Sequence, residues 1–280
     1  MKKISRRSFL AAAGLSVAAL ALTACGGSAS STASSVASSA AASSEAASTS
    51  AAAGELTTVE AGKLTMATNA AFPPYEMTTD AGEFEGIDIE TAQAIADKLG
   101  LELQIDDMDF DAALLSVQQG KADIVMAGVT VTDERKAVMD FSDSYATGIQ
   151  SIIVPEGSDI ASPDDLAGKK IGTQRGTTGY IYCSDDFGDE NVVAYDDGLT
   201  AVQALNNGQV DAVVIDNAPA QEFVAANPGL KILDTSYAEE DYAIGVAKNS
   251  PLEDAVNSAL EELKGDGTLQ AIVDKYITAE

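Results

Sequence analysis

The segment SVQQGKADIVMA, residues 116–127, joins the end of a helical pattern to a glycine, an aspartate and a buried apolar strand. The same order returns in ALNNGQVDAVVI, residues 204–215, with Gly208 in the place of Gly120. We interpret the repeat as two lobes built on one plan. Chance similarity is the alternative, because a helix, a glycine and a strand often follow one another in α/β proteins.

Short apolar strands alternate with helical patterns on both sides of these two segments. Apolar residues at helical spacing (Ala92, Ile95, Ala96 and Leu99) predict an amphipathic helix that ends at Gly100. The repeated strand–helix–strand order predicts an α/β fold with mostly parallel sheets covered by helices. The expected strands are residues 63–68, 101–105, 122–129, 169–174, 191–195, 210–216 and 243–248, and the expected helices are residues 88–100, 110–120, 199–208, 251–265 and 266–277, with one more helix opening at 177–182.

The last strand and the two helices after it are too small to form a third domain. We expect them to complete the first lobe, which then comprises residues 59–147 plus 243–280, while residues 148–242 form the second lobe. The chain crosses between the lobes twice in this arrangement, which predicts a hinge and an inter-lobe cleft. Ligands of open α/β sheets bind at the carboxyl ends of the strands, so the site is expected there.

The N-terminus has the pattern of an export signal. Residues 1–24 start with basic residues and continue with an apolar run, residues 9–22, that is too short to span a bilayer. The sequence LTAC resembles a lipobox, which implies that Cys25 becomes the lipidated first residue of the mature chain; an ordinary signal peptide is the alternative. SRRSFL, residues 5–10, resembles a twin-arginine signal, and a general secretory signal fits equally well.

The segment that comes after Cys25 is composed mostly of Ser, Ala, Thr and Gly. Residues 25–58 cannot bury a core, so we expect a disordered linker behind the lipid anchor. This organisation places the folded part outside the cytoplasm, anchored to the outer face of the cell membrane by Cys25.

The composition excludes several classes of function. The chain has 44 acidic and 16 basic residues, and without a basic stripe nucleic acid is not an expected partner. It contains no histidine, the commonest metal ligand and general base, and we expect neither a metal nor a cofactor. If Cys25 carries lipid, Cys183 has no disulfide partner, and without a histidine to activate it a nucleophilic role is not expected.

Polar residues come directly after the strand of the opening segment. Gly128 allows a ligand to approach the backbone closely, and Thr130 offers a hydroxyl and an amide. Thr132 can cap the next helix, whose first turn is acidic. Arg135 then lies at the carboxyl end of the strand, where a guanidinium can hold a carboxylate with two hydrogen bonds. A surface arginine paired with one of the many acids is the alternative.

Asp216 takes the matching place after the second strand. Its carboxylate can accept an ammonium, although an Asx turn or a helix cap would also explain it. A cation and an anion on opposite sides of a cleft suit a zwitterion. GTQRGTTGY, residues 172–180, places free amides at a helix start but lacks the spacing of a phosphate-binding loop. Phe72, before two prolines, either stacks on a ligand or belongs to the core.

Several segments together resemble one known family. They are ATNAAFPPYE (67–76), GIDIETAQAIADKLG (86–100), residues 110–145, IGTQRGTTG (171–179) and VDAVVID (210–216). The sequence is similar to the solute-binding proteins of polar amino acid ABC importers, family 3. The resemblance implies a two-lobed type II periplasmic-binding fold that closes on a free L-amino acid and delivers it to a membrane permease, without catalysing a reaction. In Gram-positive bacteria such proteins are lipoproteins, in keeping with Cys25.

The resemblance also implies roles for individual residues. Arg135 matches the residue that grips the ligand α-carboxylate, and Gly128 and Thr130 match further contacts from the first lobe. In the second lobe, Thr178 resembles the donor to the carboxylate, and Asp216 resembles the acceptor for the α-ammonium.

Four more positions match the pocket for the ligand side chain. Phe72 resembles the aromatic that stacks on it, Phe110 and Asn69 match lining positions, and Gln174 reaches the pocket from the second lobe. Well-known members carry Asp where this sequence has Asn69. The change favours a polar, uncharged or broadly tolerated amino acid over a strictly basic one.

Two alternatives to transport stay open. The fold also occurs in extracytoplasmic dehydratases of prephenate-like acids, where, without histidine, Asp216 or a glutamate would have to move the proton. An amino-acid sensor that takes no part in transport is the other alternative. The expected state of the chain is a monomer whose partners are a free amino acid, a permease and, through lipid, the membrane.

Overall fold

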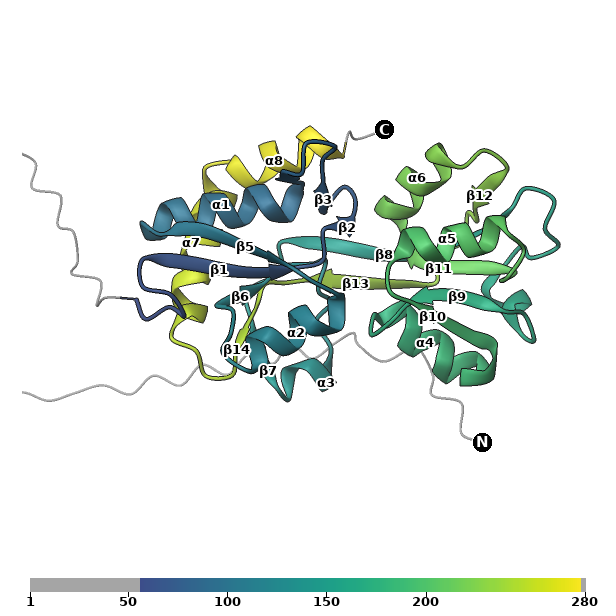
Figure 1. The fold of residues 1–280 in the computed structure, drawn as a ribbon, viewed down its shortest axis with the longest axis horizontal. Helices are drawn as coiled ribbons and strands as arrows, with labels where there is room; N and C mark the ends of the chain where they lie inside the picture. Colours follow the sequence, from purple (N-terminus) through teal and green to yellow (C-terminus); the bar gives the residue numbers. More distant parts are fainter. Residues whose placement is uncertain (1–55, 278–280) are drawn as a thin grey trace, which may run out of the picture. The chain divides into compact units, whose positions relative to one another are not determined.

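The computed structural model describes residues 56–277. The expected signal peptide, Cys25 and nearly all of the expected linker lie outside the described residues. Within the described range, no helix is long and apolar enough to cross a membrane. Two helix-covered β-sheets form two lobes, and two long strands run between them (Figure 1).

The sheet of the first lobe has the strand order β5-β1-β6-β14-β7. Its central strands are parallel, and the late strand β14 enters antiparallel between β6 and β7. This insertion brings the C-terminal helices onto the lobe that the N-terminal strands begin. The elements are β1 (Lys63–Thr68), β5 (Glu102–Asp107), β6 (Ile124–Val125), β7 (Met139–Phe141), β14 (Gly245–Ala247), α1 (Ile87–Leu99), α2 (Phe110–Gln118), α3 (Asp133–Lys136), α7 (Leu252–Gly265) and α8 (Thr268–Tyr276).

A small antiparallel sheet covers one end of this lobe. It consists of β2 (Ala71–Phe72), β3 (Glu76–Thr78) and β4 (Phe84–Glu85), and it contacts α1. The loop between β2 and β3 is fixed to the start of α1, because Ile87 N donates to Pro74 O and Asp88 N donates to Tyr75 O. These bonds hold the Phe72–Glu76 segment against the helix.

The sheet of the second lobe has the order β10-β9-β11-β8-β12, with β13 paired to β8. Strands β9, β10 and β11 are parallel, whereas β8 runs antiparallel to β11, β12 and β13. The elements are β8 (Ala146–Pro155), β9 (Ile171–Gln174), β10 (Val192–Tyr195), β11 (Ala212–Asp216), β12 (Leu230–Ile232), β13 (Ala238–Tyr242), α4 (Thr178–Phe187), α5 (Gly198–Asn206), α6 (Asn217–Ala226) and the 3-10 helices η1 (Pro163–Leu166) and η2 (Asp189–Asn191).

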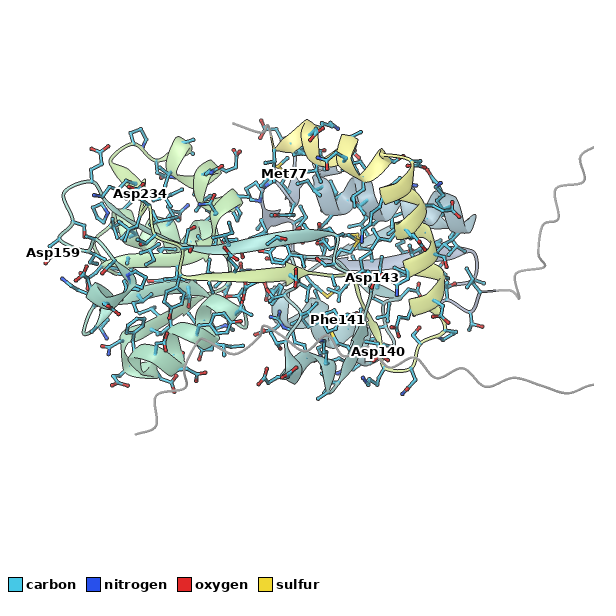
Figure 2. The ribbon with its side chains drawn as sticks, turned by 180° about the vertical axis from the view of Figure 1, so that it is seen from behind. Met77, Asp140, Phe141, Asp143, Asp159 and Asp234 are labelled. Carbon is cyan, nitrogen blue, oxygen red and sulfur yellow. The ribbon has the colours of Figure 1, made fainter. Side chains whose placement is uncertain are left out.

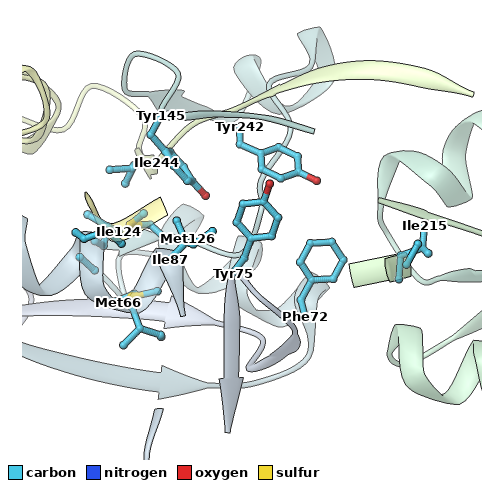
Figure 3. Packing of buried hydrophobic residues seen from close by; sticks show 14 of the residues in the cluster. Met66, Phe72, Tyr75, Ile87, Ile124, Met126, Tyr145, Ile215, Tyr242 and Ile244 are labelled. Atoms are coloured by element: carbon cyan, nitrogen blue, oxygen red, sulfur yellow. The ribbon is translucent and has the colours of Figure 1, made fainter. Parts of the chain in front are cut away.

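Strands β8 and β13 carry the chain from one lobe to the other and back. They pair along residues 146–150 and 238–242, and they are seen from behind in Figure 2. The end of β13 also joins the first lobe, because Val131 N donates to Asp241 O and Ala243 N donates to Val129 O. Tyr242 is fully buried there, with its ring 5.3 Å from that of Tyr75 (Figure 3). The sequence pattern predicts two crossings but neither of these strands.

The repeated segments have matching structures. Gly120 and Gly208 both end their helices with left-handed backbone, at φ angles of 66° and 68°. Asp123 then exchanges two hydrogen bonds with the backbone of Thr65, and Asp211 does the same with Lys170. Each aspartate therefore fixes the start of its strand to the neighbouring strand. The shared pattern is a structural device that stops a helix and starts a parallel strand.

One strand is much shorter than expected. Residues 122–129 were predicted as a strand, but the pairing of β6 covers only Ile124 and Val125. The chain leaves the sheet at this point and forms the loop that carries Gly128 and Thr130. The residues remain buried, which explains the apolar pattern, but their backbone turns towards the other lobe.

Candidate functional site

All nine predicted ligand-binding residues line one cavity at the carboxyl ends of the central strands. Its empty volume is about 420 Å³, including the part that is open to solvent. The first lobe supplies Asn69, Phe72, Phe110, Gly128, Thr130 and Arg135, and the second lobe supplies Gln174, Thr178 and Asp216. Glu76, Ala127, Gln150, Thr177, Val214 and Ile215 also line the cavity. In Figure 3, Phe72 reaches from the first lobe towards Ile215 of the second.

Arg135 is a buried cation. Thr132 caps α3 as predicted, since its hydroxyl accepts from Arg135 N at 3.2 Å. The guanidinium donates to Thr130 O at 2.7 Å and to Gly176 O at 3.1 Å, and it lies 5.3 Å from the centre of the Phe110 ring. Burial lowers the pKa of Arg135, although the charge of Glu240 acts against this change.

The guanidinium of Arg135 keeps donors for a ligand. No carboxylate of residues 56–277 forms an ion pair with it. A guanidinium has five N–H groups, so the two carbonyl contacts leave donors unused. The surface-arginine alternative is therefore wrong, because the side chain is buried and faces the cavity.

Gly128 has a conformation and a position that suit only glycine. Its φ angle is 53°, and a Cβ atom would lie 2.9 Å from the Phe72 ring and 3.2 Å from the Tyr242 ring. Its amide donates to Asp88 at 3.0 Å. The aromatic rings can therefore pack directly over the backbone at the edge of the cavity.

Asp216 is a buried carboxyl group at the end of β11. Gln150 donates to one carboxylate oxygen at 2.7 Å. Burial raises the pKa of Asp216 to about 7. Although the residue precedes α6, its side chain makes no capping hydrogen bond, so a cap does not explain it. Asp216 thus lines the cavity from the lobe opposite Arg135, and a hydrogen bond with Tyr242 acts against the rise in its pKa.

Hydrogen bonds join the two lobes across the cavity. Gln174 donates to Asn69 at 2.8 Å, and the hydroxyls of Thr130 and Thr178 lie 3.4 Å apart. Arg135 reaches Gly176 of the second lobe as well. The two walls of the site are therefore in contact in this structure.

Sequence reasoning missed the polar residues Glu76 and Gln150, which line the cavity, and Glu240, which accepts hydrogen bonds from Thr130 and Thr178. Glu76 is fully buried, and neither of its carboxylate oxygens has a partner. Burial and the nearby Asp88 raise the pKa of Glu76 well above its usual range. Gln150 and Glu240 lie on the two crossing strands, which were not predicted. Glu76 comes after Phe72 in the FPPYE motif, so its position in the motif could have revealed it.

Residues 64–279 match the family described as bacterial extracellular solute-binding proteins, family 3. The L-cystine-binding protein TcyJ of Escherichia coli K12 is 34% identical over 226 residues, covering 79% of this chain and 85% of TcyJ. The arginine-binding extracellular protein ArtP of Bacillus subtilis 168 is 33% identical over 228 residues, covering 78% of this chain and 87% of ArtP.

A solved structure is similar over the same part of the chain. The arginine-, lysine-, histidine-binding protein ArtJ of Geobacillus stearothermophilus superimposes with a TM-score of 0.75 at 34% identity, covering 78% of this chain and 96% of ArtJ. The family and these relatives are solute-binding proteins, not dehydratases or other enzymes. The chain belongs to the family 3 bacterial extracellular solute-binding proteins.

Proposed function

We propose that the chain captures a free L-amino acid in this cavity and delivers it to the permease of an ABC importer. The observation that carries the proposal is the pair of Arg135 and Asp216. A buried guanidinium with unused donors lines the cavity from one lobe, and a buried carboxyl group lines it from the other. The α-carboxylate and α-ammonium of an amino acid complement these two groups, because charge-assisted hydrogen bonds are the strongest available to them.

The other cavity residues complete the proposed site. Gly128 and Thr130 contact the ligand backbone from the first lobe, and Thr178 donates its amide to the carboxylate at the start of α4. Phe72 and Phe110 form the apolar walls of the side-chain pocket. Asn69 and Gln174 close that pocket, because they hydrogen-bond to each other across it.

Glu76 favours a ligand with a cationic side chain. A zwitterionic head group balances Arg135 and Asp216, which leaves the buried carboxyl of Glu76 for the side chain. Asn69 does not decide the charge of the ligand, since its amide already accepts from Gln174 and donates to Met108 at 3.0 Å. The similarity of the chain to both cystine- and arginine-binding relatives means that their names do not decide it either.

Binding proceeds by closure of the lobes in this proposal. Residues 59–147 plus 243–280 and residues 148–242 move as two bodies, with β8 and β13 as the hinge. The ligand binds Arg135 in the open form, and closure adds Thr178 and Asp216. The closed form is the one that the permease recognises.

The N-terminal features connect the binding domain to the membrane. Residues 1–24 direct export and are removed, lipid on Cys25 anchors the monomeric chain, and residues 25–58 tether it. Mass spectrometry of the protein from the membrane fraction tests separately whether Cys25 carries lipid. Cys25→Ser should release the protein from the membrane fraction into the medium.

A thermal-shift screen tests the ligand. The twenty amino acids, ornithine, citrulline and cystine are added to the domain of residues 56–280, and arginine, lysine or ornithine should raise Tm most. Glu76→Gln should reduce the shift with arginine more than the shift with glutamine. Glu83→Gln, an exposed change near the same small sheet, is the control. No shift with any amino acid would contradict the proposed function.

Delivery needs a test of its own. Cells that lack the gene should lose uptake of the radiolabelled amino acid that binds in the screen, and the intact gene should restore it. Normal uptake in the deletion strain, together with tight binding, would instead favour an amino-acid sensor.

A further inference from the structure

Glu240 is an acidic residue in a place where the sequence suggests a solvated strand. It is buried, while Glu239 and Asp241 on either side of it are exposed. The alternation of β13 therefore turns one carboxylate inwards, at the point where the strand passes between the lobes. This residue belongs to none of the predicted ligand contacts.

Three donors from three parts of the chain converge on one oxygen of Glu240. Thr130 of the first lobe donates to Oε2 at 3.1 Å, and Thr178 of the second lobe donates at 2.9 Å. The amide of Gln150, on the other crossing strand, donates to the same oxygen at 2.9 Å. Glu240 thus binds both threonine hydroxyls only while the lobes are together.

The protons available on Thr130 and Thr178 fix the direction in which the two hydroxyls point. Each threonine hydroxyl has one proton to donate, and Oε2 of Glu240 is the acceptor that both hydroxyls reach. The hydroxyls of Thr130 and Thr178 also lie 3.4 Å from each other. Whichever of the two donates across that contact, both protons stay within the triangle that the threonines form with Glu240. Each hydroxyl is left with lone pairs for the cavity.

Gln150 is constrained in the same way. Its two amide protons go to Glu240 and to Asp216, at 2.9 Å and 2.7 Å. The cavity near these residues is consequently lined by acceptors: the hydroxyls of Thr130 and Thr178 and the carboxyl group of Asp216. An ammonium has three N–H donors and complements such a set, whereas a hydroxyl or a keto group does not.

We propose that Glu240 is a positioning residue that turns the hydroxyl lone pairs of Thr130 and Thr178 towards the cavity, and thereby selects ligands with an α-ammonium. The inference rests on the proposed function, because it assumes that an amino acid occupies the cavity with its ammonium near Asp216. Glu240 acts through the two threonines and need not touch the ligand.

Calorimetry with two probes tests this role. L-arginine carries the α-ammonium, and 5-guanidinopentanoate is the same molecule without it, measured at millimolar concentration. Glu240→Leu removes the acceptor oxygen on which both hydroxyls converge, so their protons are free to turn towards the cavity; it should weaken binding of L-arginine by about 10- to 100-fold and binding of the analogue by less than about 3-fold. Glu239→Gln, the exposed neighbour on the same strand, should change neither.

A double-mutant cycle separates positioning from a simple loss of negative charge. Thr130→Val with Thr178→Val removes both hydroxyls at constant shape, and should weaken L-arginine selectively to a similar extent. Combining these changes with Glu240→Leu should add less than about 3-fold, because both act on the same hydroxyls. If Glu240 acted only by its charge, the effects would multiply. The valine variant tests the same selectivity by itself should Glu240→Leu fail to fold.

The outcomes distinguish the inference from the function beneath it. Equal weakening of both probes by Glu240→Leu, or multiplied effects in the cycle, overturns the positioning role while leaving the proposed amino acid binding intact. If the unmodified protein binds no amino acid in the screen, the proposed function is wrong and the role of Glu240 falls with it. Where the screen identifies another amino acid, that ligand and its 2-deamino analogue replace the arginine pair.

Discussion

The two segments that share one helix–glycine–aspartate–strand plan diverge where their strands end. In the first lobe, β6 ends after two residues, and a loop leads to the short helix that presents Arg135. In the second lobe, β11 continues for five residues and presents Asp216 at its own end. The common part builds the framework, while the divergent part places opposite charges on the two walls of the cavity. The shared helix–glycine–aspartate–strand segment therefore builds the framework of each lobe, whereas the residues that follow each strand supply the groups proposed to bind the ligand.

Arg135→Ala should cause the largest loss of ligand affinity. Removing one partner of a buried, charged hydrogen-bonded pair costs roughly 2–5 kcal/mol, which weakens binding by about 30-fold to several thousand-fold. Calorimetry with the amino acid found in the screen measures the loss. Arg175→Ala is the matched control, because Arg175 is an arginine of the second lobe whose side chain is 55% exposed. Near-native affinity in Arg135→Ala would exclude it as the carboxylate ligand.

Asp216→Asn should have a smaller effect, near the lower end of the same range, at about 30- to 100-fold. The amide keeps the shape of the carboxylate but loses the charge that an α-ammonium needs. Asp189→Asn, an exposed change in the same lobe, is the control. Retention of full affinity at neutral pH would remove Asp216 from the site.

The pH dependence sharpens the same assignment. Because burial raises the pKa of Asp216 to about 7, and that of Asp88 to about 6, the ligand-free protein holds protons that the unfolded chain releases near pH 4. Its stability should be fully present below pH 4 for these groups and should fall as pH rises through 6 to 7. Ligand affinity should change in the opposite direction, since only ionised Asp216 accepts the ammonium. Thermal melts and calorimetry between pH 5 and about 8 measure both, and Asp216→Asn should remove the contribution of Asp216 from each curve while Asp88 and Glu76, whose pKa values are also raised by burial, still contribute to the stability curve.

Gly176→Ala should disfavour the closed form and reduce ligand affinity by less than Arg135→Ala or Asp216→Asn does. Gly176 has a φ angle of 73°, and a Cβ atom would lie 1.6 Å from a carboxylate oxygen of Asp111 in the other lobe. The backbone strain costs about 1–2 kcal/mol in either state, but the clash exists only when the lobes meet. We expect affinity to fall by about 10-fold, that is about 1.4 kcal/mol.

The second variant of this experiment identifies the cause. Asp111→Ala with Gly176→Ala should restore part of the affinity but none of the lost Tm. Gly157→Ala is neutral by expectation, because nothing lies within 4 Å of its added Cβ atom. Failure of the double variant to recover affinity would mean that backbone strain alone is responsible.

Local patterns predicted much of this fold, and contacts between distant segments account for what was missed. The helix that ends at Gly100 shows a clear apolar period, and its left-handed cap was predicted correctly. Strand β13 reads AEEDY, and only its pairing with β8 explains why Glu240 is buried there. Motif matching brought nine residues to one cavity, but it passed over Glu76, whose burial depends on the packing of its loop against α1. Sequence patterns reveal which residues are close along the chain, whereas the burial of Glu76 and Glu240 depends on contacts with segments that are distant in the sequence.

Replacing the two aspartates of the repeat should leave ligand affinity unchanged. The two replacements should lower the free energy of unfolding by different amounts. Asp123 is buried and accepts from two backbone amides, Val59 N and Thr65 N, both at 2.8 Å, whereas exposed Asp211 accepts only from Lys170 N at 2.8 Å. Leaving buried amides without acceptors costs about 1–3 kcal/mol, while water can replace an exposed acceptor. Asp123→Ala should therefore lower the free energy of unfolding by about 2 kcal/mol, and Asp211→Ala by less than about 1 kcal/mol.

Urea titration measures both free energies of unfolding. Each variant should keep native ligand affinity, because the aspartates lie at the ends of the strands away from the cavity. Equal losses of stability would show that the two copies of the plan contribute alike, and a loss of affinity would show that the framework and the site are not separate.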